Sequence, residues 1–240
     1  MDNRELGYLR RQRIEGKITV KELKDRVIAS CQKMPVVDVH TACGSELALI
    51  KDKGLRDYMY ILLKRIPRYF WHVPASVIGF HETYTDNLMG GLLVHSRKVA
   101  RVAQKIGDPY GIAYLSDDFV VAGLLHDGLK YGLNGIVPKG DDHATFAASW
   151  LEENSIFDDR PQIRDMIRTH LGRWGLSKPN TDAEMAFHLA DFVVSRGASP
   201  ALDGATSKSG MKFSSKNTSG ARSRTSSSSK SKGKYGRRRY

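Results

Sequence analysis

Hydrophobic and polar residues follow a helical period along most of the chain up to about residue 197. Apolar positions recur every three or four residues, which is the pattern of helices that bury one face. The pattern predicts helices over residues 20–34, 45–65, 89–106, 116–130, 160–171 and 182–196, and another that begins near residue 143. Residues 35–46 fit either a short strand or an extended connection. The chain is therefore predicted to be mostly helical.

Polar residues at the helix starts support these boundaries. Thr19 with Glu22, and Thr181 with Glu184, have the spacing of a capping box, in which each side chain accepts a hydrogen bond from the other residue's backbone N–H. Asp141 or Asp142 is placed to cap the helix that begins with His143.

The charge of the chain changes this picture only at its C-terminal end. The net charge is +12, but residues 204–240 contain eleven lysine and arginine residues and no acid, so residues 1–203 are nearly neutral. The same segment is rich in serine and glycine and poor in apolar residues, a composition that predicts disorder. We expect this basic tail to bind nucleic acid or another polyanion through its positive charges. A solubilising tail with no specific partner is the alternative.

The sequence contains few signals for a cellular compartment or a membrane. No apolar stretch reaches the roughly 18 residues that a spanning helix needs, and residues 1–5 lack a signal-peptide core. Cys31 and Cys43 have no metal-type spacing. A cytoplasmic protein with reduced thiols, without a membrane partner, is the simplest expectation; a single disulfide is the alternative.

Candidate chemistry begins at the end of the most apolar predicted helix. Residues 119–125 are apolar, and His126 and Asp127 follow directly, with Lys130 four residues after the histidine. Burying an imidazole and a carboxylate is costly unless they are paired or bind a metal. A surface His-Asp pair is the alternative. Four more histidine or aspartate residues lie in or beside separate amphipathic segments: His95, His143, His170 and Asp191. Each helix of a bundle can contribute one ligand to a shared metal site, so these four residues are able to converge on the His126–Asp127 pair.

The order of these six residues resembles the HD-domain metal-dependent phosphohydrolases, in the form with six ligands and two metals. Short sequence motifs at residues 90–96, 125–130 and 188–191 also resemble those of the family, and the resemblance covers about residues 56–197. It implies an all-α, HD-domain helical bundle. We accordingly divide the chain into an N-terminal helical extension (1–55), an HD domain (56–203) and the basic tail (204–240).

The resemblance also implies roles for individual residues. Asp127 would bridge two divalent transition metals, one completed by His95, His126 and Asp191, the other by His143 and His170. Ligands rich in imidazole suit Mn, Fe, Co, Ni or Zn. Asp127 and Lys130 are the expected catalytic residues, and the side chains expected to contact substrate phosphate are Lys98, Lys130 and Arg173.

Within the superfamily, residues 74–95 and 181–191 are most similar to bacterial HD-type 3′-to-5′ exoribonucleases. The expected activity is therefore phosphoester hydrolysis in nucleic acid or nucleotides, foremost as a 3′-to-5′ exonuclease. Those enzymes carry an N-terminal nucleic-acid-binding barrel, whereas residues 1–55 here read as mostly helical. Two alternatives stay open: a nucleotidase or nucleoside-triphosphate hydrolase, and a nucleic-acid-binding protein without catalysis.

Overall fold

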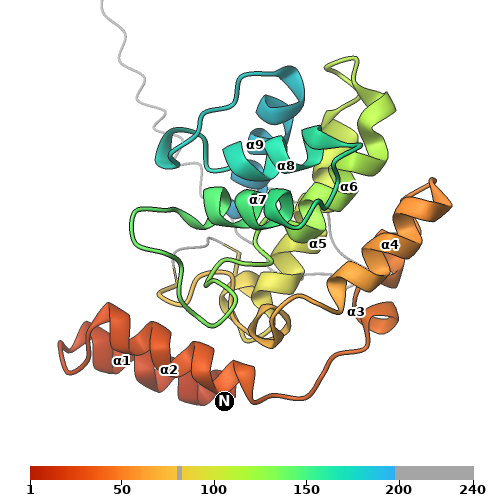
Figure 1. Cartoon of the computed structure of the whole chain (residues 1–240). Helices are drawn as coiled ribbons and strands as arrows, with labels where there is room; N and C mark the ends of the chain where they lie inside the picture. The colour runs from red at the N-terminus through yellow and green to blue at the C-terminus, as the bar shows by residue number, and fades with distance from the viewer. Residues whose placement is uncertain (80–82, 198–240) are drawn as a thin grey trace, which may run out of the picture. The chain divides into compact units, whose positions relative to one another are not determined.

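The computed structural model of the chain describes residues 1–79 and 83–197, which form nine α-helices and four short 3-10 helices without a strand (Figure 1). This confirms the all-α prediction for the described residues; the basic tail lies outside them. The elements are α1 (Asn3–Ile14), α2 (Val20–Gln32), α3 (Val39–Leu47), α4 (Lys53–Leu63), η1 (Arg68–Trp71), η2 (Thr85–Asn87), α5 (Gly91–Ile106), η3 (Ala113–Leu115), α6 (Ser116–Leu125), α7 (His143–Glu153), α8 (Pro161–Thr169), η4 (Gly172–Trp174) and α9 (Asp182–Ser195). None of these helices is both long and apolar enough to cross a membrane.

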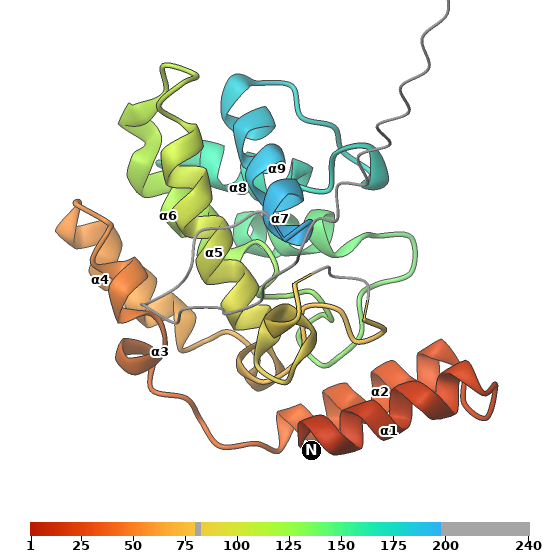
Figure 2. The ribbon, with the colours of Figure 1, turned by 180° about the vertical axis from the view of Figure 1, so that it is seen from behind.

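Helices α1 and α2 lie side by side as a hairpin at the N-terminus (Figures 1 and 2). The predicted capping box opens α2: the Thr19 hydroxyl accepts from the Glu22 amide at 3.1 Å, and the Glu22 carboxylate accepts from the Thr19 amide at 2.7 Å. Apolar residues of both helices, among them Leu6 and Leu23, are buried in the core. The hairpin is thus packed against the rest of the described residues.

The single helix predicted over residues 45–65 is wrong, because two helices, α3 and α4, occupy this region and the chain breaks between them. The Asp117 carboxylate accepts from the backbone amides of Lys51 and Asp52 at 3.0 and 2.8 Å. Asp52 in turn caps α4 by accepting from the Leu55 amide. A side chain 65 residues away therefore satisfies the amides at the break, a contact that local periodicity cannot register.

Two further boundaries differ from the prediction. Residues 39–47 are helical rather than a strand or an extended connection, because Asp38 caps α3 through the Thr41 amide at 2.8 Å. The helix predicted over 116–130 ends at Leu125, so that the His-Asp pair lies in the turn that follows α6. The buried Tyr69 hydroxyl, from η1, bonds to this turn: it accepts from the Tyr131 amide at 3.1 Å and donates to the Gly132 carbonyl at 2.8 Å.

Helices α5 and α6 pack closely against each other; α5 carries His95, and α6 leads into the turn that holds His126 and Asp127. Gly123 of α6 makes this approach possible, since a Cβ there would overlap the backbone of Ala100 in α5. Helix α9 packs against α5, α8 packs against α6 and α9, and α7 packs against α8. The aromatic residues Tyr69, Phe70 and Trp71 are buried in the core.

Candidate metal centre

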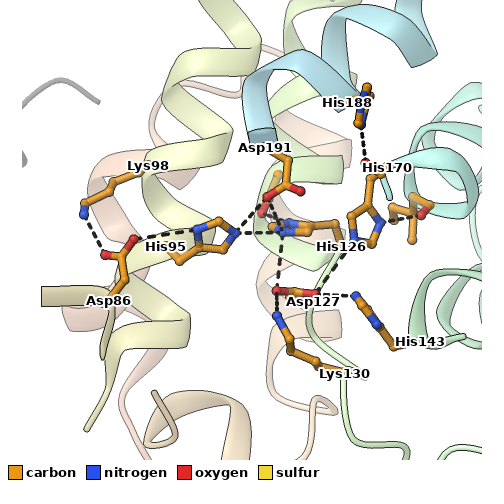
Figure 3. A network of polar contacts seen from close by, with 12 residues as sticks. Asp86, His95, Lys98, His126, Asp127, Lys130, His143, His170, His188 and Asp191 are labelled. Atoms are coloured by element: carbon orange, nitrogen blue, oxygen red, sulfur yellow. Dashed lines mark hydrogen bonds and ion pairs between the residues drawn. The ribbon is translucent and has the colours of Figure 1, made fainter. Parts of the chain in front are cut away.

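The structure brings all six candidate ligands together at one place (Figure 3). Five segments contribute: His95 comes from the middle of α5, and His126 and Asp127 from the turn after α6. The remaining ligands stand at or within the later helices, as the first residue of α7, the residue after α8 and a residue in α9: His143, His170 and Asp191.

One side of the centre is formed by two histidines and a carboxylate. His95 Nε2 lies 2.9 Å from Asp191 Oδ1 and 3.4 Å from His126 Nε2. His126 Nε2 lies 3.8 Å from the same oxygen of Asp191. The ligand atoms of these three residues are all within 4.8 Å of one another, which is compact enough to surround one metal ion.

Asp127 stands between this group and the other two histidines. Its Oδ2 atom is 3.7 Å from His126 Nε2, while its Oδ1 atom is 3.1 Å from His143 Nε2 and 3.9 Å from His170 Nε2. The two carboxylate oxygens thus face different histidines. His126, Asp127 and His170 form a second group of three ligand atoms within 4.8 Å.

Backbone carbonyls orient two of the imidazole rings. His126 Nδ1 donates to the Gly123 carbonyl at 2.9 Å, and His170 Nδ1 donates to the Ile167 carbonyl at 2.7 Å. A carbonyl only accepts, so the proton resides on Nδ1 and the Nε2 lone pair is presented to the centre. His188 is not among the grouped ligands: its Nδ1 bonds to the His170 carbonyl at 2.7 Å.

The electrostatics fit a bound cation. Burial raises the pKa of Asp127, but Lys130 and His126 outweigh it and hold the pKa well below its usual range. Burial, with the charges of His126 and His143, lowers the pKa of His170 to about 3. Ligands must be deprotonated to bind metal, and these two residues already are at neutral pH.

His95 differs, because two carboxylates flank its ring. Burial lowers its pKa, but Asp191 and Asp86 outweigh that effect and raise the pKa to about 9. Asp86 Oδ2 lies 3.8 Å from His95 Nδ1, on the face opposite Asp191 (Figure 3). A metal entering between His95 and Asp191 would replace the Nε2 proton.

Two buried polar atoms support the same fit. Asp127 Oδ1 and His143 Nε2 are both buried and make no hydrogen bond within the described residues, although they lie 3.1 Å apart. An unsatisfied buried polar atom costs free energy that a shared cation would recover. The nitrogen and oxygen donors present here suit the transition metals expected from the sequence.

The three expected phosphate contacts are placed differently from one another. Lys130 is half-buried beside the centre, with Nζ 2.6 Å from Asp127 Oδ2. Lys98 is buried behind His95, where Nζ donates to Asp86 Oδ1 at 2.6 Å. Arg173 is exposed, with its guanidinium 4.5 Å from the Trp174 ring centre. The structure therefore brings only Lys130 to the six ligands, and the substrate contacts of Lys98 and Arg173 stay predictions.

A cavity of about 890 Å³ opens onto the centre. His143, His170, Asp191 and Lys130 line one part of it. The remaining wall comes from segments far apart in the sequence and includes Lys21, Lys24, Tyr131, Trp174, Phe192 and Arg196. The sequence analysis did not identify these residues as a group, because only the packing of α2, η4 and α9 brings them together. The local sequence signal for this wall was Trp174, which lies between two glycines in residues 172–175.

Comparison with known families gives one match: residues 92–194 match the family model described as HD domain. The matched span contains all six grouped side chains and excludes the α1–α2 hairpin. Comparisons with curated proteins and with solved structures gave no match.

Proposed function

Because residues 92–194 match the HD domain of metal-dependent phosphohydrolases, we propose that the chain cleaves phosphodiester bonds at the 3′ end of a nucleic-acid strand. Domains of this family bind divalent metals, and the His/Asp groups described above are where this chain would hold them. The proposed complement is two ions of Mn, Fe, Co, Ni or Zn.

The observation that carries the nucleic-acid proposal is the aromatic wall of the cavity. Trp174 is 55% exposed, and its ring is nearly parallel to that of Phe192, with centroids 5.9 Å apart and an interplanar angle of 12°. Both residues line the cavity that opens onto the metal centre. Exposed aromatic rings stack on nucleobases without regard to sequence. A terminal nucleotide can therefore stack its base here while its phosphate lies at the ligands.

The chain's own residues divide the work of hydrolysis. His95, His126 and Asp191 would hold one ion, His143 and His170 the other, and Asp127 would link them. Two bound metals supply an activated water and neutralise charge on the phosphoryl oxygens. Burial lowers the pKa of Lys130, but Asp127 outweighs it and raises the pKa, so Lys130 remains an ammonium. In that state it can donate a hydrogen bond to a phosphoryl or leaving oxygen and does not act as a base.

A nucleotidase or nucleoside-triphosphate hydrolase is the second candidate, favoured by the size of the cavity. A volume of about 890 Å³ falls in the range of roughly 300–1,000 Å³ that is typical of sites for single small molecules. The N-terminal hairpin is helical rather than a nucleic-acid-binding barrel, which also suits a small substrate.

A product analysis separates the candidates. Metal-loaded protein would be incubated with single-stranded RNA and DNA labelled at the 5′ end, and separately with mononucleotides and nucleoside triphosphates. Stepwise shortening from the 3′ end is the expected result. Release of phosphate or pyrophosphate from free nucleotides, with intact strands, would select the second candidate. Hydrolysis of neither substrate class would contradict both candidates, and equal hydrolysis by Asp127→Ala would refute the assignment of the activity to these ligands.

A further inference from the structure

The N-terminal hairpin supplies a wall of the cavity. Lys21, Lys24 and Ile28 of α2 line the same cavity as His143 and His170. This helix lies outside the span that matches the HD domain. Helix α2 therefore adds to the cavity beside the metal centre a surface that the HD domain itself does not provide.

Specific bonds hold the hairpin in this position. Arg10 of α1 donates from Nε to the Val77 carbonyl at 2.9 Å and from Nη2 to the Ser76 carbonyl at 2.8 Å. Asn3 accepts from the Met89 amide at 2.8 Å. Ser76 and Val77 themselves line the cavity. The hairpin is thus tied to the segment that leads into α5, and its lysines stand at a defined place on the wall.

The cations on the cavity wall differ in how they are neutralised. Lys130 pairs with Asp127, and Lys21 pairs with Asp25, each at 2.6 Å. Lys24 is half-buried and makes no hydrogen bond or ion pair with any described residue. A lysine that is partly removed from water and has no acidic partner attracts an anion more strongly than a fully solvated one.

We propose that Lys24 binds a second phosphate group of the substrate, separate from the phosphate cleaved at the metal centre. The inference rests on the proposed function and narrows it to substrates that carry at least two phosphates. The second phosphate can be the neighbouring phosphodiester of a strand or the adjoining phosphate of a nucleoside polyphosphate. Lys24 would then act through substrate affinity, with little influence on the chemical step.

Steady-state kinetics on Lys24→Glu test the proposal. The substrates are a 5′-phosphorylated dinucleotide and a nucleoside triphosphate, each with more than one phosphate, and bis(p-nitrophenyl) phosphate, which has one. We expect KM to rise about tenfold for a substrate with a second phosphate, with kcat within about twofold, because only ground-state binding is lost. KM for bis(p-nitrophenyl) phosphate should be unchanged, and Lys24→Arg should restore binding.

Arg26→Glu is the matched control. Arg26 is exposed on the same helix, does not line the described cavity, and its replacement changes the charge by the same amount. An equal rise in KM for Arg26→Glu, or for the substrate with one phosphate, would show a general field effect and overturn the proposal. A rise confined to the dinucleotide assigns the second phosphate to a strand, and one confined to the triphosphate assigns it to a free nucleotide.

Failure of the proposed function would be visible separately, as absence of hydrolysis by the wild-type protein. Lys24 is then tested by calorimetry with inorganic pyrophosphate and the manganese-loaded protein. A dissociation constant about tenfold weaker for Lys24→Glu than for wild type and Arg26→Glu would support the phosphate contact. Equal constants for all three proteins would overturn it.

Discussion

At the scale of single residues, the centre depends most on Asp127. Its two oxygens contact different histidines, and it also neutralises Lys130. Loss of this carboxylate therefore affects both groups of ligands at once, whereas loss of a peripheral histidine affects one.

Asp127→Ala should remove bound metal and lower turnover by more than about a hundredfold, because even partners that merely orient a ligand contribute 10- to 100-fold. The apolar core does not involve this side chain, so the helical circular dichroism should be retained. Elemental analysis and a hydrolysis assay on the same preparation provide the test. Full metal content and activity in the variant would refute the site assignment.

His143→Ala and His170→Ala should each leave about one metal per chain instead of two, because His95, His126 and Asp191 keep their mutual contacts. Turnover should fall even when metal is in excess. The number of metal ions per chain, measured by elemental analysis, tests this prediction. A content equal to that of wild type in both variants would indicate a centre with one metal.

At the scale of elements, helix ends place the ligands. Asp142 begins α7 by accepting from the Thr145 amide at 2.7 Å, and its other oxygen accepts from the Leu176 amide at 2.6 Å. His143 is the next residue. The same carboxylate thus sets where α7 starts and ties it to the segment that carries Trp174.

Asp142→Ala should destabilise the fold by about 1 kcal/mol, the usual contribution of a helix cap. Burial raises the pKa of Asp142, but the Thr145 and Leu176 amides outweigh it and lower the pKa. Its stabilisation is therefore complete above the unfolded pKa of about 3.9 and is lost as the pH falls through the lower folded value.

Thermal unfolding from pH 7 to pH 2 checks this expectation. The difference in Tm between wild type and Asp142→Ala should be about 2–4 °C at neutral pH and should shrink in acid. Asp141→Ala is the control, since Asp141 is exposed and caps no helix among the described residues. A constant difference across the pH range would rule out the capping carboxylate as its cause.

At the scale of the whole chain, the basic segment 204–240 remains a proposed contact for nucleic acid. A chain that ends at residue 203 should bind single-stranded RNA about tenfold more weakly at 50 mM salt, with a smaller difference at 200 mM, because fewer counterions are released. Its hydrolysis of mononucleotides should match wild type. Binding by fluorescence anisotropy at both salt concentrations is the measurement. Unchanged affinity at low salt would leave the segment without this role.

The sequence anticipated those parts of the fold and site that depend on local signals. The helical period, the Thr19–Glu22 box and a cap at Asp141 or Asp142 predicted most helices; the structure uses Asp142 as that cap and brings the six candidate ligands together. The second expected box is modified: Thr181 accepts from the Glu184 amide, but the Glu184 carboxylate bonds to the Asn180 amide instead of that of Thr181.

The features that escaped prediction depend on contacts between distant segments. Asp117 accepts from the backbone amides at the break in the helix expected over residues 45–65, and Asp86 pairs with Lys98 behind His95. The wall of the cavity joins α2 to α9, and no local pattern along the chain encodes that pairing.

The exposure of Trp174 has an optical consequence. It is the most exposed of the three tryptophans: Trp71 is buried, Trp150 is half-buried, and Trp174 stands on the cavity wall. A water-borne quencher such as iodide therefore reaches one fluorophore far more readily than the other two. Any molecule that fills the cavity shields Trp174 from the quencher. Occupancy of the cavity can therefore be followed by tryptophan fluorescence without any catalytic turnover.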